Sequence, residues 1–159
     1  MGNIVKLGID ATDRLAPLIA GFRAELKSFK GISAEADLAA AITEAMEFFA
    51  AGFPIYAYEE AGRYLGYLIC RVDGAVWVEH FYVVPEHRGR GIADALYDVA
   101  EGLAAPDTPY NWIHPNNDAM IRFLAKRGYD VLNLIEVRKR RVGEVLRGKV
   151  EIMGGVYEY

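Results

Sequence analysis

The sequence is poor in several features that would assign it quickly to a class of protein. Its 159 residues contain a single cysteine, Cys70, so no disulfide can form within the chain and a reducing cytoplasm is the expected compartment. No apolar run approaches the length needed to cross a bilayer, and the N-terminus lacks the charged and apolar regions of a secretory signal. Lys6 stands where a myristoylation motif needs Ser or Thr. These absences predict a chain without membrane attachment.

The charge balance also excludes a class of partner. The net charge is −4, which does not favour a general nucleic-acid-binding surface, and we expect neither nucleic acid nor a metal ion as a partner. A basic run at Arg138–Arg141 is the one local exception. Such a run is typical of a solvated strand end, and holding an anionic ligand or a subunit partner is the alternative. With 53% hydrophobic residues, the chain is long enough for one compact domain.

The most informative stretch runs from Phe81 to Ala93, where an apolar strand leads into a glycine-containing turn that opens a helix. Gly89 and Gly91 allow backbone angles closed to other residues and let the backbone approach a ligand. Apolar residues then recur at helical spacing, at Ile92, Ala95, Leu96, Val99 and Leu103. The N–H groups of the first helical turn and the positive end of the helix dipole point into the turn. This arrangement predicts an anion site suited to a pyrophosphate.

Two better-known phosphate-binding patterns do not fit this turn. A P-loop needs Lys-Ser or Lys-Thr directly after its glycines, and neither pair is present. The dinucleotide fingerprint G-x-G-x-x-G would need a third glycine where Asp94 stands, and no clear βαβ unit surrounds it. The remaining pattern is R-x-x-G-x-A at Arg88, Gly91 and Ala93.

This pattern, preceded by Val83-Val84-Pro85, closely resembles motif A of the GCN5-related N-acetyltransferases, the GNAT family. Residues Asn117–Tyr129 resemble the family's motif B, in which an Asn opens a helix that ends at a Gly followed by an aromatic residue. Each piece also occurs as ordinary helix capping in other proteins. The order of elements agrees as well, and the resemblance covers roughly Ile4–Arg138.

The sequence predicts an α/β (α+β) fold of the GNAT type, with a mixed, mostly antiparallel central sheet of six or seven strands and about four helices. The predicted order is β-α-α-β-β-β-α-β-α-β. We expect helices that begin at Thr12, Ser33, Ile92 and Asn117. The expected strands are Ile4–Ile9, Ile55–Tyr58, Tyr64–Val72, Val76–Val84, Tyr110–Ile113 and Val131–Arg138, with further strands at Val150–Met153 and Val156–Tyr159.

In this interpretation residues 1–141 form the GNAT-like domain. Residues 142–159 form a C-terminal extension that contributes strands to the same domain. The segment could complete the sheet of a second copy, and a homodimer is therefore a further expectation.

The resemblance implies acetyl-CoA as the cofactor. The strand ending at Val83 would separate from its neighbour, and the pantetheine arm would pair with the backbone exposed there. The turn would hold the pyrophosphate through its N–H groups, and Asn117 would hydrogen-bond the arm or the adjoining backbone. The cofactor-binding residues expected from the resemblance are Phe81, Tyr82, Val83, Arg88, Gly89, Arg90, Gly91, Ile92, Ala93 and Asn117.

Glu79 is the first candidate for a catalytic base, because it shares a strand face with Trp77 and Phe81 near the expected acceptor site. A carboxylate on a strand is also commonly solvated or salt-bridged. His114 is a second candidate, whereas His80 should point to the opposite face of a regular strand. The tyrosine that serves many GNAT enzymes as general acid is replaced here by Leu124.

The resemblance therefore implies an acyl-CoA-dependent N-acetyltransferase that moves an acetyl group to a primary amine of a small molecule or a protein. The alternative is a non-catalytic module of the same fold that binds acyl-CoA as a sensor or scaffold. The missing tyrosine favours this alternative.

Overall fold

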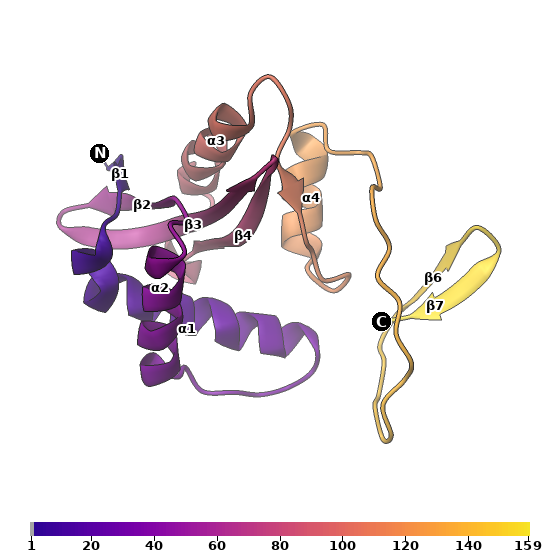
Figure 1. Cartoon of the computed structure of the whole chain (residues 1–159). Helices are drawn as coiled ribbons and strands as arrows, with labels where there is room; N and C mark the ends of the chain where they lie inside the picture. Colours follow the sequence, from indigo (N-terminus) through magenta and orange to yellow (C-terminus); the bar gives the residue numbers. More distant parts are fainter. Residues whose placement is uncertain (1) are drawn as a thin grey trace. The chain divides into compact units, whose positions relative to one another are not determined.

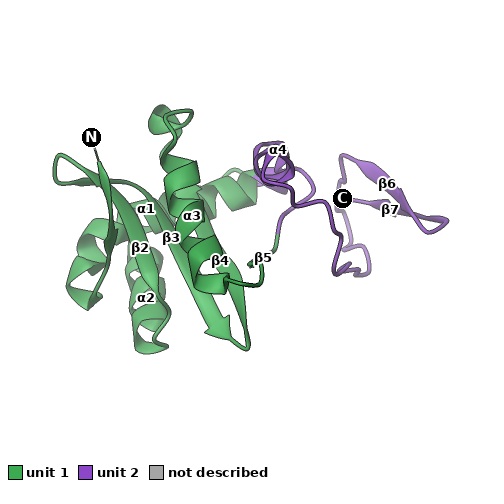
Figure 2. Ribbon diagram, turned by 90° about the horizontal axis from the view of Figure 1, so that it is seen from above, with its two compact units in different colours: residues 1–28, 33–112 green, residues 29–32, 113–159 purple. Residues whose placement is uncertain are grey.

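The computed structural model describes residues 2–159, which fall into two compact units (Figure 2). Of the described residues, the first unit contains 2–28 and 33–112, and the second contains 29–32 and 113–159. Along the described chain the strands and helices follow the order β-α-α-β-β-β-α-β-α-β-β (Figure 1). A search of the described residues finds no helix long and apolar enough to span a bilayer.

A five-stranded sheet is the framework of the first unit. The first four strands in the sheet are antiparallel neighbours, whereas the fifth runs parallel to the fourth. Gly62 and Gly74 take left-handed φ angles of 74° and 64° in the tight turns between the hairpin strands, as glycine permits. Their spatial order is β1 (Asn3–Lys6), β2 (Ile55–Glu60), β3 (Arg63–Asp73), β4 (Ala75–Val83) and β5 (Tyr110–Asn111). The predicted antiparallel meander is confirmed.

Helices cover both faces of this sheet. The long helices α1 (Thr12–Phe29) and α2 (Leu38–Ala50) lie against one face, and α3 (Ile92–Ala104) lies against the other (Figure 1). Gly66 of β3 allows α3 to approach closely, because a Cβ there would lie 2.8 Å from the Tyr82 carbonyl oxygen and 3.1 Å from a methyl group of Leu96. The core on the α1 and α2 side includes Leu15, Ile19, Ala41, Ala45, Ile55, Tyr67 and Ile69.

The second unit holds the remaining elements. Helix α4 (Asp118–Lys126) begins after Asn117, whose side chain accepts a hydrogen bond from the backbone N–H of Met120 at 3.1 Å. The predicted motif B helix and its Asn cap are therefore confirmed. Strands β6 (Lys149–Ile152) and β7 (Gly155–Glu158) form an antiparallel hairpin that is a sheet of its own.

The fold class is confirmed, but two predicted elements are wrong. Val131–Arg138 forms no strand, so the central sheet has five strands rather than six or seven. A strand is stable only beside a partner, and no described strand pairs with this segment. The second helix begins later than the predicted cap at Ser33. Asp37 caps it instead, with its carboxylate accepting from the N–H of Ala40 at 2.9 Å.

A polar cluster around buried His80 joins both helices to the sheet. His80 of β4 is 3% exposed, its Nδ1 lies 3.0 Å from the Tyr67 hydroxyl, and its Nε2 lies 3.4 Å from a carboxylate oxygen of Glu44. Arg23 of α1 completes the cluster by pairing with Glu44 of α2. Burial raises the pKa of Tyr67 far above its usual value, so the hydroxyl keeps its proton and donates to Nδ1. Nε2 then carries the ring proton and faces Glu44.

Burial sets the protonation of this cluster. It lowers the pKa of His80 despite the attraction of Glu44, so the ring is neutral in the folded protein near pH 7. Burial by itself raises the pKa of Glu44, but hydrogen bonds from His80 and Arg23 outweigh it and lower the pKa to about 2. Both groups therefore take up protons less readily in the folded chain than in the unfolded chain.

We predict that the free energy of unfolding decreases as the pH falls below about 6.5, where an unfolded histidine becomes protonated and folded His80 does not. A second decrease follows below about 4.5 from Glu44. Urea unfolding at pH 7.5 and pH 5.5 measures the first effect. The wild-type chain should lose on the order of 1 kcal/mol more than His80→Gln over this interval.

His87→Gln is the matched control, because this ring lies outside the cluster at the surface of the β4–α3 turn. It should keep the pH dependence of the wild-type chain. If the free energy of unfolding falls by the same amount between pH 7.5 and pH 5.5 in His80→Gln and in the wild-type chain, buried His80 does not contribute to the pH dependence of stability.

Candidate functional site

The turn between β4 and α3 has the backbone geometry of an anion cradle. Gly89 has a φ of 76°, and Gly91 caps α3 in the left-handed conformation with a φ of 80°. A Cβ added at either position would meet no atom within 4 Å, so the dihedral angles, not lack of space, require glycine here. The first intrahelical bond of α3 runs from the N–H of Ala95 to Gly91. The N–H groups of the preceding residues, Ile92 and Ala93 among them, have no acceptor inside the helix.

Two arginine side chains brace this turn. Arg88 donates from Nε to the carbonyl oxygen of Val83 at 2.9 Å and forms an ion pair with Glu25 of α1 at 2.6 Å. Arg90 forms an ion pair with Glu60 of β2 at 2.9 Å. Both guanidinium groups therefore hold the turn against the rest of the first unit. The geometry leaves contact with an anion mainly to the backbone N–H groups and the helix dipole.

The sheet opens next to this turn. The parallel ladder between β4 and β5 contains only the pairs Trp77 with Tyr110 and Val78 with Asn111. Beyond them the remainder of β4, residues 79–83, has β3 on one side and no described strand on the other (Figure 1). Alternate backbone groups of an edge strand point outward, so this part of β4 can pair with an extended ligand that carries amides.

The residues expected to bind the cofactor, Phe81–Val83 and Arg88–Ala93, all lie in the first unit along this opening and turn. The carbonyl oxygen of Val83 already accepts a hydrogen bond from Arg88. Its second lone pair is therefore the one open to a pantetheine arm. Asn117 lies in the second unit, and its side-chain oxygen caps α4. The role of each of these residues in binding stays a prediction.

Glu79 occupies an irregular position in β4. The pairing with β3 shifts register at this point, because His80 is opposite Ile69 while Val78 is opposite Cys70, so Glu79 is an extra residue in the ladder. Such bulges re-aim side chains and occur often beside active sites. The Glu79 carboxylate accepts a hydrogen bond from Arg71 Nε at 2.8 Å. The ion pair with Arg71 is the salt-bridged state that the sequence analysis gave as the alternative to a catalytic role for Glu79.

The two other histidine candidates differ in their surroundings. His80 faces α1 and α2 inside the buried cluster, on the opposite face from Glu79, as the alternation along the strand predicted. His114 lies in the second unit, where its ring stacks on Phe29 with centroids 6.2 Å apart and its Nδ1 accepts from the N–H of Asn116 at 3.1 Å. Burial lowers the pKa of His114, and the charge of Lys30 adds to this shift.

The position at which many family members carry the general-acid tyrosine holds Leu124 here. Leu124 is 4% exposed in α4, so the position is an apolar contact. Tyr97 is completely buried in α3 and donates its hydroxyl proton to Asn111 of β5 at 3.0 Å. This bond fixes α3 against the short strand, which is a structural role. Within residues 2–159 no group of three or more His, Cys, Asp or Glu side chains is arranged to hold a metal ion.

Sequence reasoning missed the partners of the charged residues at the site. Arg71 was not singled out, although the turn at Gly74 sets a register in which Arg71 lies opposite Trp77 and diagonal to Glu79. That diagonal relation was a usable signal. The ion pair of Arg88 with Glu25 joins residues 63 positions apart, and no local pattern indicates it.

A groove between α1 and α2 is a further concave feature of the first unit. Its volume is about 220 Å³, and its lining includes three carboxylates, two cationic side chains and four alanines. The lining residues are Ala20, Arg23, Ala24, Lys27, Glu35, Asp37, Ala40, Ala41 and Glu44.

Known structures share this fold. An aminoglycoside N-acetyltransferase AAC(6')-Iy in complex with CoA has a TM-score of 0.66 at 16% identity, over 89% of this chain and 95% of that one. A PaiA N-acetyltransferase from Thermoplasma acidophilum in complex with coenzyme A has a TM-score of 0.67 at 16% identity, over 85% and 93%. A ribosomal-protein-alanine N-acetyltransferase from Brucella melitensis biovar Abortus 2308 has a TM-score of 0.63 at 20% identity, over 89% and 99%.

At these identities the likeness shows the fold alone. A search of curated proteins gave no match. The sequence profile of the acetyltransferase (GNAT) family, however, matches residues 21–129, which is more than half of the chain and includes the β4–α3 turn and α4. The chain therefore belongs to the GNAT acetyltransferase family.

Proposed function

We propose that the chain is an acyl-CoA-dependent N-acetyltransferase that moves an acetyl group from acetyl-CoA to a primary amine of a small molecule or a protein. The observation that carries this proposal is the continuous path from the unpaired side of β4 into the glycine turn and the N-terminus of α3. The outward backbone groups of residues 79–83 suit the amides of a pantetheine arm, and the helix N-terminus suits a pyrophosphate. Solved structures of this fold that hold coenzyme A support the assignment.

In the proposed reaction the bound cofactor supplies a thioester as the acetyl donor. A backbone N–H near Val83 donates to the carbonyl oxygen as negative charge develops on it. The amine forms the new C–N bond and loses one proton, and the C–S bond breaks with release of the thiolate. A thiol with a pKa of about 8.5 is a tolerable leaving group, so Leu124 in place of a tyrosine is compatible with transfer.

The pKa of the acceptor amine determines how much free energy its deprotonation costs at pH 7, and therefore how strongly the reaction needs a catalytic base. Deprotonating a lysine-like amine with a pKa of about 10.4 costs about 4.6 kcal/mol at pH 7, and an α-amine near 7.8 costs about 1 kcal/mol. We propose Glu79 as the base, directly or through water, after it exchanges its hydrogen bond with Arg71 for one with the amine. His114 is the second candidate for this role.

The buried single cysteine supports a reducing compartment, and we propose the cytoplasm. We further propose that residues 142–159 belong with residues 1–141 in one functional domain.

The second candidate function is an acyl-CoA sensor or scaffold without turnover. Leu124 favours it, because the apolar side chain removes the usual proton donor. Thiol release from acetyl-CoA, measured against a panel of amines, separates the two functions. Turnover on any amine supports the transferase, whereas tight binding of acetyl-CoA without turnover supports the sensor. No binding in a calorimetric titration contradicts both.

Replacing Gly91 by Val should weaken acetyl-CoA binding by about tenfold or more. A β-branched residue is strained at a φ of 80°, so the turn must rearrange and misalign its N–H groups. Isothermal titration calorimetry measures the change. Gly102→Ala is the control, because Gly102 lies in α3 with open space around it and no left-handed φ angle. Equal affinities of both variants would remove the turn from the binding site.

Glu79→Gln should lower kcat/KM by about 10² to 10⁴-fold at a pH below the pKa of the amine, as loss of a general base does. The loss should shrink as the pH rises and the free amine becomes abundant. Asp73→Asn is the matched control, since it removes the other carboxylate near Arg71, at 4.0 Å, and should leave the pH profile unchanged. If Glu79→Gln leaves the profile unchanged as well, Glu79 is not the base.

A further inference from the structure

The carboxylate of Glu79 is held by a cation from the neighbouring strand. Arg71 of β3 donates from Nε to Oε1 of Glu79 at 2.8 Å, and its guanidinium lies over the Trp77 ring, 5.3 Å from the ring centre. Asp73 lies 4.0 Å from the same guanidinium, which is too far for a hydrogen bond. Glu79 and Trp77 are therefore the two groups that hold this cation.

Trp77 belongs to a cluster of aromatic rings in the last two strands of the sheet and the residue that follows. Tyr110 of β5 stacks on Trp77 with centroids 4.9 Å apart, and Trp112 meets Trp77 at an interplanar angle of 81° and a distance of 5.6 Å. Trp112 is 71% exposed, so the cluster is open to solvent. The face of an aromatic ring attracts a cation, and that of an indole does so most strongly. The cluster and the Glu79 carboxylate together have the composition of a site for a cationic group.

Glu79 lies where the ladder between β4 and β5 ends. Trp77 pairs with Tyr110 and Val78 pairs with Asn111, and Glu79 is the first residue of β4 beyond these pairs. All five residues belong to the first unit. The Arg71 guanidinium therefore contacts β4 at the start of the opening along which the proposed cofactor lies.

The contact between Arg71 and Glu79 can be exchanged for another. Both side chains reach solvent, with 30% of the Arg71 side chain and 25% of the Glu79 side chain exposed. Ion pairs that are open to water contribute little to stability. Among the described residues, Arg71 is the one side-chain donor to the Glu79 carboxylate. A second cation can therefore take the place of the guanidinium.

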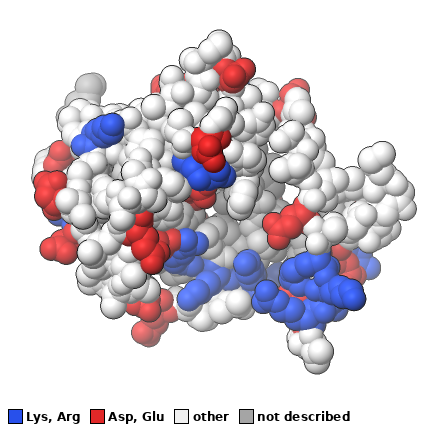
Figure 3. Space-filling view, viewed as in Figure 1, with Lys and Arg blue, Asp and Glu red and all other residues white. Residues whose placement is uncertain are grey.

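The charge of the first unit favours a cationic ligand. This unit has eight Lys and Arg against sixteen Asp and Glu, a net charge of −8, and the second has ten against six, a net charge of +4. Figure 3 shows the densest group of basic side chains on the C-terminal part of the chain. A negatively charged surface raises the local concentration of cations and speeds their association.

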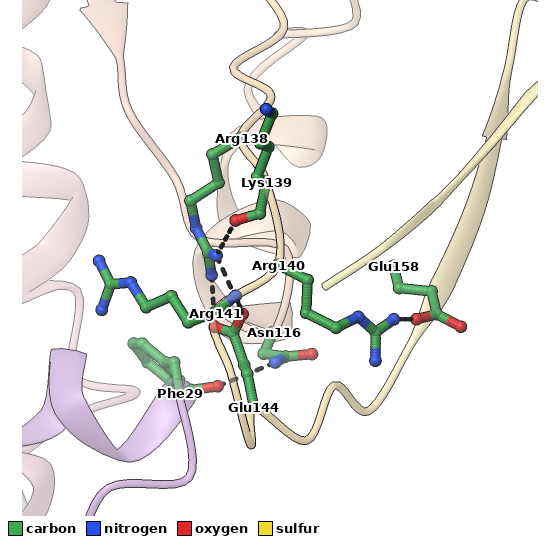
Figure 4. A network of polar contacts seen from close by, with 8 residues as sticks. All are labelled: Phe29, Asn116, Arg138, Lys139, Arg140, Arg141, Glu144 and Glu158. Carbon is green, nitrogen blue, oxygen red and sulfur yellow. Dashed lines mark hydrogen bonds and ion pairs between the residues drawn. The ribbon is translucent and has the colours of Figure 1, made fainter.

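The basic run Arg138–Arg141 is engaged within the second unit. Arg138 forms an ion pair with Glu144, and the same carboxylate accepts from the N–H of Arg141 at 3.1 Å (Figure 4). Arg140 forms an ion pair with Glu158 of β7. The excess negative charge of the first unit is therefore open to cations from solution.

We propose that Arg71 is an internal stand-in for the acceptor, which enters as an alkylammonium cation and replaces the guanidinium at Glu79 and Trp77. The identification of this cation as the acceptor rests on the proposed function. Because one cation is exchanged for another, the carboxylate keeps a charged partner throughout. A neutral amine would form a weaker hydrogen bond than the guanidinium that it displaces. The site therefore selects amines that are protonated at the working pH over amines that are neutral.

The exchange agrees with the proton balance of the reaction. The bound ammonium passes one proton to the Glu79 carboxylate and becomes the nucleophile. Its nitrogen forms the C–N bond while the C–S bond of the thioester breaks. The second proton that the nitrogen loses balances the charge of the departing thiolate.

Tryptophan fluorescence reports on this site, because Trp77 and Trp112 are the two tryptophans of the chain. A titration of the full chain with n-butylamine, a cation at pH 7, should give a saturable change in fluorescence. The neutral n-butanol, which has the same chain length, should bind about tenfold more weakly, since a hydrogen bond to a charged group is stronger. Equal dissociation constants for the two compounds would overturn the proposal.

Replacing Arg71 by Met removes the guanidinium but keeps an unbranched side chain beside Trp77. The dissociation constant for n-butylamine should fall by about two- to fivefold, because the ligand no longer has to break an ion pair. Arg63→Met is the matched control, since it removes an exposed arginine at the other end of β3 and should bind n-butylamine as the wild-type chain does. If Arg71→Met binds n-butylamine no more tightly than the wild-type chain, Arg71 does not stand in for a ligand.

Turnover separates this inference from the proposed function. At pH 8.5 an alkylamine with a pKa of about 10.4 remains a cation, whereas an α-amine with a pKa of about 7.8 is mostly neutral. With acetyl-CoA, n-butylamine should therefore have a lower KM than the α-amine glycinamide. Turnover with equal KM values, or with a lower KM for glycinamide, would overturn the inference and leave the transferase. Binding of n-butylamine without turnover on any amine would contradict the transferase and leave the cation site.

Discussion

The early end of the ladder between β4 and β5 is the constraint on which the rest of the site depends. Only two residue pairs join these parallel strands. The Tyr97 hydroxyl of α3 adds a hydrogen bond to the side chain of Asn111 in β5. Had the ladder continued, residues 79–83 would have been buried strand with no backbone groups to offer. Because it stops, the end of β4 is an edge inside the fold and leads directly into the cradle formed by Gly89 and Gly91.

The alternation along β4 divides its chemistry between two faces. His80 turns toward α1 and α2, where Tyr67 and Glu44 satisfy both ring nitrogens, and its role is to join helices to sheet. Glu79 turns to the opposite face and pairs with Arg71. Glu79 is the extra residue of a β-bulge, and the bulge alters the direction in which its side chain points relative to that of His80. One strand thus supplies a buried anchor and an accessible carboxylate at consecutive positions.

Local signals in the sequence were sufficient for most of the fold and for the turn. The glycines in the β4–α3 turn, the Asn117 cap and the alternating strands each follow from a few neighbouring residues, and the structure has them. The two failures arise where local signals compete or need a partner. Ser33 and Asp37 are both good caps, and the strand propensity of residues 131–138 has no partner strand to act on.

The partners of the charged groups were the least predictable part of the site. Pairs such as Arg88 with Glu25, or Arg90 with Glu60, depend on how distant helices and strands come together. Residue types within a motif carry no information about such contacts. The same limit applies to the groove between α1 and α2, whose lining also includes residues of the loop between them.

The ion pairs of Arg88 and Arg90 affect how strongly the β4–α3 turn would attract an anion. Each guanidinium beside the cradle already faces a carboxylate, so the local ionic charge is close to balanced and attraction rests on fixed amide dipoles at short range. Mobile ions screen fields that extend beyond about 10 Å at 0.1 M salt and act weakly on contacts made directly to N–H groups. Binding of a polyphosphate at this turn would therefore depend on geometry more than on ionic strength.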